Sequence, residues 1–293
     1  AAGTVTPELI REHCRQAAKH GIAPFIYFQC AGDGHIPYVE KEFPDSMART
    51  AAGRLMRCWI NCCLMNSDAS TSFGRHIRRQ IGRLFARYPE IGGVFLDQLC
   101  YNGLDLAHHD GMTMYQNQPA YMLEFCYDET VRLLAEEVHR RGLCMIANGP
   151  YNVEVQRYVD SHMAEGTSEM VHLLKYLCVE KPLLFLAYYK NAEQAERMFQ
   201  NCLLAGASYS IDLACTNDRV EKLIAGYLPL IQPLLGRRWV LEPRPIDLPE
   251  NHEGNIFLSE RGEVLVTLVR VRGSLFDAAG PAKDITVRIR AKA

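Results

Sequence analysis

Two acidic residues stand at the ends of short apolar segments, and they are the first candidates for chemistry. Asp97 follows an apolar run in IGGVFLDQLCYNG, and Glu165 lies near the end of HMAEG. Short apolar runs of this kind are typical of buried strands, so we expect both carboxylates at an open rim. Hydrolysis of a glycosidic bond needs two carboxyl groups, one that attacks or stabilises the anomeric carbon and one that protonates the leaving oxygen.

We assign Asp97 as the nucleophile and Glu165 as the general acid and base. Such a pair needs two environments, a drier one for the acid and a hydrogen-bonded one for the nucleophile. Gln98 supplies a donor beside Asp97. For either acid the structural alternative is a helix cap or a salt-bridge partner. Other acids near Glu165 compete for its role, namely Glu154, Asp160 and Glu169.

The two acids are positioned by a repeated alternation of helix and strand patterns. Six apolar segments read as strands, at residues 22–29, 92–98, 143–149, 160–166, 182–189 and 207–213. Amphipathic segments between them predict helices, as in FGRHIRRQIGRLFARYP, where four apolar residues share one helical face. Strands buried on both faces that alternate with helices favour a parallel α/β sheet.

Two α/β architectures fit this alternation. An open doubly wound sheet usually carries a glycine-rich phosphate loop, and the sequence has no GxGxxG or P-loop motif. A (β/α)8 TIM-type barrel places its chemistry at the carboxyl ends of its strands. Polar residues end the six segments here: Gln29, Asp97, Asn148, Glu165, Tyr188 and Asp212. We therefore predict a barrel.

The barrel is expected over residues 1–238 and would be short of two strands. Counted back from its end, the six segments are strands three to eight, so the first two lie upstream or are irregular. RCWINCCLMN is either a seventh strand or an elaboration of the loop after Gln29. Beyond Gly236 the pattern alternates with a period of two. Residues 239–293 are thus predicted to form an antiparallel β region, a partial β-sandwich.

Aromatic and amide side chains near these strand ends are candidates for sugar binding. Aromatic faces stack on pyranose C–H surfaces, and planar amides and carboxylates bind paired hydroxyls. The predicted binding residues are Gln29, Trp59, Gln98, Tyr101, Asn102, His108, Asn148, Tyr188 and Asp212. Core packing remains an alternative for Trp59, a turn position for Asn148 and a helix cap for Asp212. Only one of Tyr188 and its neighbour can point inward.

Metal and cofactor chemistry has weaker signals. His108, His109 and Asp110 are adjacent in the sequence and could bind a divalent ion, but no further ligand stands at a suitable spacing. A sugar-contacting loop and an ordinary solvated loop are the alternatives. CWINCC has no second CxxC partner. We expect no metal and no cofactor. Most of the eleven cysteines read as reduced core residues, which is typical of a reducing compartment such as the cytoplasm.

The bulk properties restrict the partners. A net charge of −2 over 293 residues gives no basic field for nucleic acid, and no apolar run approaches a membrane span. The oligomeric state is not indicated. The opening AAGTVTPELI lacks Met and reads as part of something longer. A carbohydrate is the expected partner.

The stretches RYPEIGGVFLDQL, NGPYN and MAEG resemble the catalytic barrels of retaining α-glycosidases of the α-galactosidase type and related bacterial glycosidase-like proteins. The resemblance covers roughly residues 7–270. It implies that Asp97 ends the fourth strand as nucleophile and that Glu165 ends the sixth as acid/base. Those families usually carry Lys two residues before the nucleophile and Asp as the acid, where this chain has Phe95 and Glu165. Enzymes acting on α-linked N-acetylgalactosamine also pair Asp with Glu.

The expected function is therefore a glycoside hydrolase, retaining and acting on an α-linked sugar. A non-catalytic carbohydrate-binding or degenerate barrel is the first alternative, motivated by the missing strands and the missing Lys. A metal-dependent barrel hydrolase or lyase built on the histidine loop is the second. A serine triad is not supported, because the chain has no GxSxG motif.

Overall fold

The computed structural model describes residues 5–29, 33–99, 103–149, 152–178, 180–210, 217–242, 245–271, 273–274 and 285–290. By its internal contacts the chain divides into two compact units, residues 1–160 and 161–293. Each unit is described by itself.

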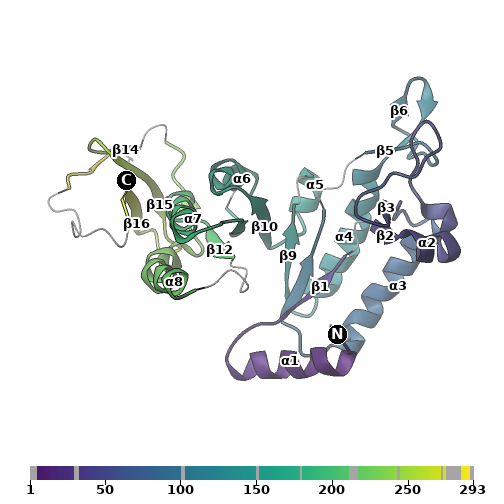
Figure 1. Ribbon diagram of the computed structural model, residues 1–293, viewed down its shortest axis with the longest axis horizontal. Helices are drawn as coiled ribbons and strands as arrows, with labels where there is room; N and C mark the ends of the chain where they lie inside the picture. The colour runs from purple at the N-terminus through teal and green to yellow at the C-terminus, as the bar shows by residue number, and fades with distance from the viewer. Residues whose placement is uncertain are drawn as a thin grey trace. The chain divides into compact units, whose positions relative to one another are not determined.

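The first unit is built on three parallel strands in the order β1-β4-β9 (Figure 1). They are β1 (Phe25–Phe28), β4 (Gly93–Leu96) and β9 (Cys144–Asn148). All three had been expected from their apolar runs, and their parallel pairing confirms the α/β class in this unit.

Successive side chains of the central strand β4 point to opposite faces of the sheet. Val94 and Leu96 are fully buried in one core together with the apolar faces of α3 (Ser72–Arg87) and α4 (Leu123–His139). The predicted helical stripe of α3 is confirmed, because its four apolar residues are all buried: Ile77, Ile81, Leu84 and Phe85. Phe95, of opposite parity, is only half-buried and contacts Tyr27 of β1 at a ring-centroid distance of 6.0 Å. The helices therefore cover the face of β4 that carries Val94 and Leu96, and the face that carries Phe95 is less buried.

Two glycines allow β4 to lie close to its neighbours. A Cβ atom on Gly93 would be 2.3 Å from the carbonyl oxygen of Cys144 and 2.3 Å from the ring of Phe25. On Gly92 it would be 2.6 Å from Cβ of Ala23. The Gly-Gly pair before the apolar run is thus needed for packing on both sides of the strand.

The remaining elements of the first unit are helix α1 (Pro7–Lys19) and the segments that lie between or after the strands of this sheet in the sequence. Helix α1 begins at Thr6, whose hydroxyl accepts a hydrogen bond from the Leu9 amide, as the Thr-Pro sequence predicts. The loop after β1 carries β2 (Asp33–His35), α2 (Ile36–Glu42), η1 (Pro44–Ser46) and β3 (Cys62–Leu64). Strands β2 and β3 pair antiparallel, so RCWINCCLMN is a loop elaboration and not a strand of the parallel sheet.

Short antiparallel pairs and one short helix complete the unit. They are β5 (Leu104–Asp105) with β8 (Tyr121–Met122), β6 (Met114–Tyr115) with β7 (Gln118–Pro119), and α5 (Val153–Gln156).

The second unit also contains three parallel strands, β10 (Ser161–Gly166), β11 (Leu183–Ala187) and β12 (Ser208–Ser210), in that order. Its helical elements are η2 (Ser168–Met170), α6 (Val171–Cys178), α7 (Ala192–Ala205), α8 (Asp218–Ile231) and η4 (Gln232–Leu234). The parallel pairing of these strands was expected from their sequences.

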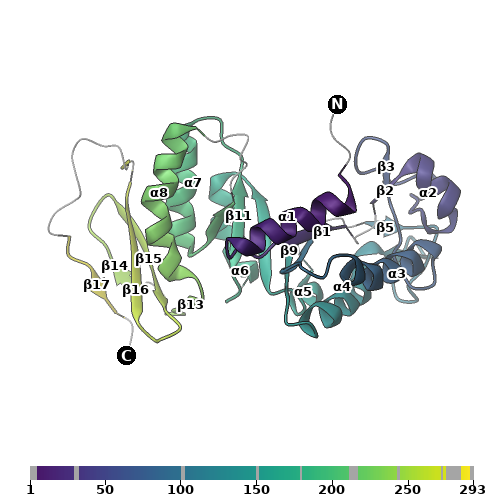
Figure 2. The same ribbon diagram turned by 90° about the horizontal axis from the view of Figure 1, so that it is seen from below.

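An antiparallel region follows, as the alternating pattern predicts. Strands β13 (Arg238–Trp239), β15 (His252–Leu258) and β16 (Val264–Arg270) form one sheet, and β14 (Ile246–Asp247) pairs with β17 (Arg288–Ile289). Helix α7 contacts β11 and β12 as well as β15 and β16, and α8 lies beside it (Figure 2). Residues 198–205 of α7 are consequently all buried. This part of α7 is therefore packed against neighbouring elements on every side of the helix.

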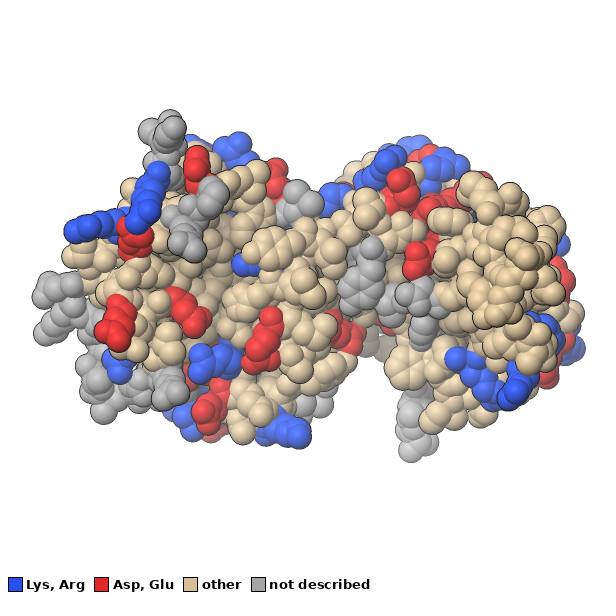
Figure 3. Space-filling view, turned by 90° about the horizontal axis from the view of Figure 1, so that it is seen from above, with Lys and Arg blue, Asp and Glu red and all other residues tan. Residues whose placement is uncertain are grey.

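The strands that are described do not form a closed eight-stranded barrel. The predicted boundary near residue 238 falls inside the second unit, and it stays a prediction. No helix in the described part of the chain has the length and apolarity that a bilayer crossing requires. Acidic and basic side chains are interspersed on the surface seen in Figure 3, in keeping with the small net charge.

Gly93→Ala tests the close approach of β4 to β9. The added methyl group meets backbone and an aromatic ring, so we expect a loss of about 1–3 kcal/mol in the free energy of unfolding. Gly82→Ala is the matched control, because Gly82 lies exposed in α3 with open space around its Cβ position; it should gain about 0.5–1 kcal/mol. Urea denaturation followed by circular dichroism measures both. Equal effects of the two variants would contradict the packing argument.

Candidate active site

Three polar side chains stand at equivalent positions, one residue beyond the last aligned pairs of β1, β4 and β9. The strand pairing aligns Phe28 with Leu96 and Leu96 with Ala147. One residue further along each strand stand Gln29, Asp97 and Asn148. Because strand side chains alternate, these three continue the face of Phe95 and not the helix-covered face of Leu96. The structure therefore brings together three residues that the sequence predicted separately.

The carboxylate of Asp97 is held at both oxygens. The Tyr27 hydroxyl donates to Oδ2 at 2.5 Å, and the Asn148 amide donates to Oδ1 at 2.7 Å. Both donors come from strands that flank β4. Asp97 is half-buried and Tyr27 is 54% exposed, so the carboxylate is oriented by neutral donors and still accessible.

The chain turns sharply after Asp97. Gln98 has a φ of 61°, in the left-handed region that few non-glycine residues adopt. Its side-chain carbonyl accepts a hydrogen bond from the Gln29 amide, and the Leu99 amide donates to the backbone carbonyl of Asn148 at 3.1 Å. These contacts tie the turn to both neighbouring strands. Gln98 thus ties the end of β4 to β1, and the expectation that it also donates to Asp97 stays a prediction.

Tyr27 was missed by the sequence analysis. Its signal was available in the strand period, because Tyr27 lies two residues before Gln29 and so on the same face of β1. It was overlooked because it sits inside a continuous apolar run, where a tyrosine reads as core.

The second acid occupies a corresponding place in the second unit. Glu165 pairs in register with Leu186 near the carboxyl end of β10. Ala164 on the opposite face is buried against the helices, whereas Glu165 is half-buried. The hydroxyl of Tyr188, which is 70% exposed, donates to Oε2 of Glu165. Of the two adjacent tyrosines, Tyr188 is therefore the one that reaches the acid.

A hollow of about 350 Å³ lies within the second unit, and Tyr188, the partner of Glu165, is part of its lining. It opens at the carboxyl ends of β10 and β11 and at the start of α7. Its lining combines hydroxyl, aromatic and charged side chains: Thr167, Ser168, Glu169, Tyr188, Tyr189, Lys190, Gln194 and Arg197.

Both ring nitrogens of His108 have partners within the first unit. Nδ1 of His108 faces the fully buried Asp105 carboxylate at 2.5 Å, and Nε2 faces the Asp45 backbone carbonyl at 2.6 Å. Two acceptors are satisfied only by a doubly protonated ring. The hydrogen bond with Asp105 accordingly raises the pKa of His108, against the opposing effect of burial.

The neighbouring carboxylates in this loop are also occupied. Burial acts to raise the pKa of Asp105, but hydrogen bonds from His108 and from the Arg49 and Ala107 amides outweigh it, and the pKa is lowered. Asp110 accepts hydrogen bonds from the Met112, Thr113 and Met122 amides and from the Thr113 hydroxyl. Within the described ranges, no three His, Cys, Asp or Glu side chains are grouped to hold a metal ion.

Of the other predicted binding residues, Trp59 lies in an exposed turn and three lie outside the described part of the chain. Trp59 is 57% exposed in the turn between the bridged residues Arg57 and Cys63. Tyr101, Asn102 and Asp212 lie outside the described residues. Among the described cysteines, Cys178 and Cys202 are buried as expected and Cys144 is exposed at the start of β9.

Comparison with known proteins identifies the fold. No protein-family model and no curated protein sequence matches the chain. Among solved structures, a GH36 α-galactosidase AgaA variant of Geobacillus stearothermophilus is similar with a TM-score of 0.59 and 14% identity, over 95% of this chain and 40% of that one. The α-N-acetylgalactosaminidase NagBb of Bifidobacterium bifidum gives 0.54 and 12%, over 89% and 42%.

A third similar structure is the maltogenic α-amylase AmyB of Thermotoga neapolitana, with a TM-score of 0.50 and 7% identity, over 90% of this chain and 68% of that one. The chain spans about two fifths of the length of the first two proteins. At these identities the likeness shows a shared glycosidase-type fold.

The His108–Asp105 pair predicts a pH dependence of stability. The folded-state pKa of His108 is raised above 6.5, so its contribution is complete below that pH and is lost as the pH rises through the raised value. The folded-state pKa of Asp105 is lowered below 3.8, so its contribution is lost as the pH falls through the lowered value. The pair therefore stabilises the protein most between these limits.

Denaturant unfolding across the neutral to alkaline range measures this effect. The free energy of unfolding should fall by about 1–2 kcal/mol as His108 deprotonates, and His108→Gln should abolish that fall. His109→Gln, a change at the exposed neighbour, is the control and should retain it. The same pH dependence in His108→Gln as in the unaltered protein would refute the assignment.

Proposed function

We propose that the chain is the catalytic part of a glycoside hydrolase that retains the anomeric configuration and acts on an α-linked sugar. The observation that carries the proposal is the carboxylate of Asp97, oriented at both oxygens at the carboxyl end of a parallel strand. The similarity in fold to glycosidases supports it. We further propose that the six parallel strands belong to a (β/α)8 barrel whose first strands are absent or irregular.

Asp97 acts as the nucleophile in this proposal. One carboxylate oxygen forms a bond to the anomeric carbon while the bond to the leaving oxygen breaks. The Tyr27 hydroxyl and the Asn148 amide hold the carboxylate plane, which removes the rotational freedom that an exposed aspartate would otherwise lose on attack. The ring of Tyr27 also contacts the ring of Phe95, and this contact helps to position the hydroxyl donor.

Glu165 acts as the general acid and then as the general base. Its proton passes to the leaving oxygen as that bond breaks, and the resulting carboxylate later takes a proton from the water that attacks the glycosyl–Asp97 ester. Tyr188 orients the carboxyl group through its hydroxyl. The proposal requires both acids to act on the same bond, a requirement that the kinetics of the two variants below test directly.

Asp97→Asn should lower kcat/KM for the best substrate in a panel of 4-nitrophenyl α-glycosides by about 10³-fold or more, because an amide cannot attack. Sugar binding measured by calorimetry should persist. Asp218→Asn, at an exposed first-turn position of α8, is the control and should keep full activity. Unchanged turnover in Asp97→Asn would overturn the assignment, and sugar binding without turnover in the unaltered chain would favour a carbohydrate-binding module.

Glu165→Gln should show a loss that depends on the leaving group. A substrate with a poorly acidic leaving group needs protonation, so its kcat/KM should fall by about 10²–10⁴-fold, whereas an activated aryl glycoside should be cleaved with a much smaller loss. Glu193→Gln, on the exposed surface of α7, is the control. A uniform loss across leaving groups would exclude the acid role. NMR of the first-formed sugar reports the anomer, and inversion would contradict the nucleophile role of Asp97.

A further inference from the structure

The hollow in the second unit is connected to Glu165 through Tyr188, and the role proposed for Asp97 does not use it. Tyr188 belongs to both features, because it lines the hollow and donates a hydrogen bond to Glu165. An acid that protonates a leaving oxygen must touch that oxygen. If Glu165 has this role, the remainder of the leaving group lies near Glu165, and the hollow that shares Tyr188 with it is one space that can hold that group.

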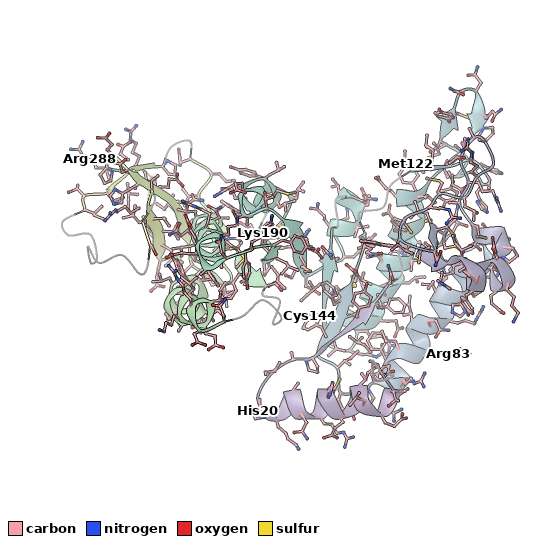
Figure 4. All side chains as sticks on the ribbon, in the orientation of Figure 1. His20, Arg83, Met122, Cys144, Lys190 and Arg288 are labelled. Carbon is pink, nitrogen blue, oxygen red and sulfur yellow. The ribbon has the colours of Figure 1, made fainter. Side chains whose placement is uncertain are left out.

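The hollow carries two basic side chains and one acidic one. Lys190 follows β11 (Figure 4), and Arg197 projects from α7. Neither forms a salt bridge with a described carboxylate. Glu169 is the acid in the lining, and it already accepts a hydrogen bond from the Ser168 hydroxyl at 2.9 Å.

The charge balance of the lining favours an anion. Hydrogen bonds from its own amide and from Ser168 lower the pKa of Glu169, and the positive charge of Arg197 adds to this. Glu169 therefore offsets one of the two cations and leaves the other. Glu165 is not among the residues that line the hollow. Glu193, in the first turn of α7, does not line the hollow.

The backbone at this place is well fixed. The Lys190 amide donates to Oε1 of Gln194 at 2.8 Å, and the Gln194 amide donates to Oδ1 of Asn191 at 2.9 Å. These reciprocal bonds cap α7 and hold the chain that carries Lys190. The positive end of the helix dipole of α7 therefore lies at the same rim and adds to the field of the two cations.

We infer that this hollow is a leaving-group subsite for an anionic group, a carboxylate, sulfate or phosphate carried by the group that the enzyme releases. The inference rests on the proposed role of Glu165. Arg197 supplies the planar donors that suit a carboxylate or phosphate, and Lys190 supplies a point charge. Tyr188 and Tyr189 supply aromatic faces for the ring that bears the anion.

The test compares two aryl glycosides of the sugar that the chain cleaves best. One has a 3-carboxyphenyl leaving group and the other a 3-carbamoylphenyl group of the same shape without charge. The carboxylate should be preferred in kcat/KM by roughly three- to tenfold, and high salt should reduce the preference. Lys190→Gln and Arg197→Gln should each reduce this preference, measured as the ratio of kcat/KM for the two glycosides within each variant. Lys222→Gln, on the exposed surface of α8, should leave it unchanged.

The outcomes separate this inference from the proposed function. Cleavage of both glycosides without a carboxylate preference, or with a preference that survives in both variants, overturns the anionic subsite and leaves the glycosidase intact. If the chain cleaves no glycoside in the 4-nitrophenyl panel, the proposed function fails. Calorimetry with D-glucuronate and D-glucose then tests the hollow alone: glucuronate should bind more tightly, and Arg197→Gln should remove the difference. Equal binding of the two sugars overturns the inference.

Discussion

The register of β4 between β1 and β9 is the constraint on which the candidate nucleophile depends. Side chains alternate across a strand, so a slip of one residue would move Asp97 to the face that α3 and α4 cover. The carboxylate would then meet the core that Val94 and Leu96 now fill. The close approach of Gly93 to Cys144 favours the observed register, because a residue with a side chain could not occupy that place.

The parts of this arrangement that follow from local sequence were predictable. Each parallel strand is a short apolar run, α3 has a clear apolar stripe, and Asp97 and Asn148 end their strands within a few residues of the apolar core. Tertiary pairing decided the rest. Nothing local says that Tyr27 donates to Asp97, that Gln29 reaches Gln98, or that β2 and β3 pair within the loop after β1, since those partners are separated by tens of residues.

Helix α7 shows the same limit in the second unit. Its sequence is only moderately apolar, yet Glu196, Gln200 and Asn201 are buried because strands pack on two sides of it. The free-energy cost of burying polar groups is offset by hydrogen bonds from distant segments. Glu196 accepts hydrogen bonds from the Tyr227 and Ser274 hydroxyls, and Gln200 donates to Tyr227. From the sequence, the polar residues of α7 predict an exposed face. That face is buried because β15 and β16 also pack against the helix. The fixed start of this helix is what holds Lys190 and Arg197 at the hollow.

The electrostatics of Asp97 distinguish this site from the families that the sequence resembles. Those families usually place Lys two residues before the nucleophile, and this chain places Phe95 there. The donors described around Asp97 are neutral, a phenol and an amide. Neutral donors orient a carboxylate without cancelling its charge, so the charge remains available to a cation. A transition state with oxocarbenium character brings a positive charge to the site only as the glycosidic bond breaks. In the proposed reaction, the attraction between that charge and Asp97 is stronger in the transition state than in the bound substrate, which is the condition for accelerating the reaction.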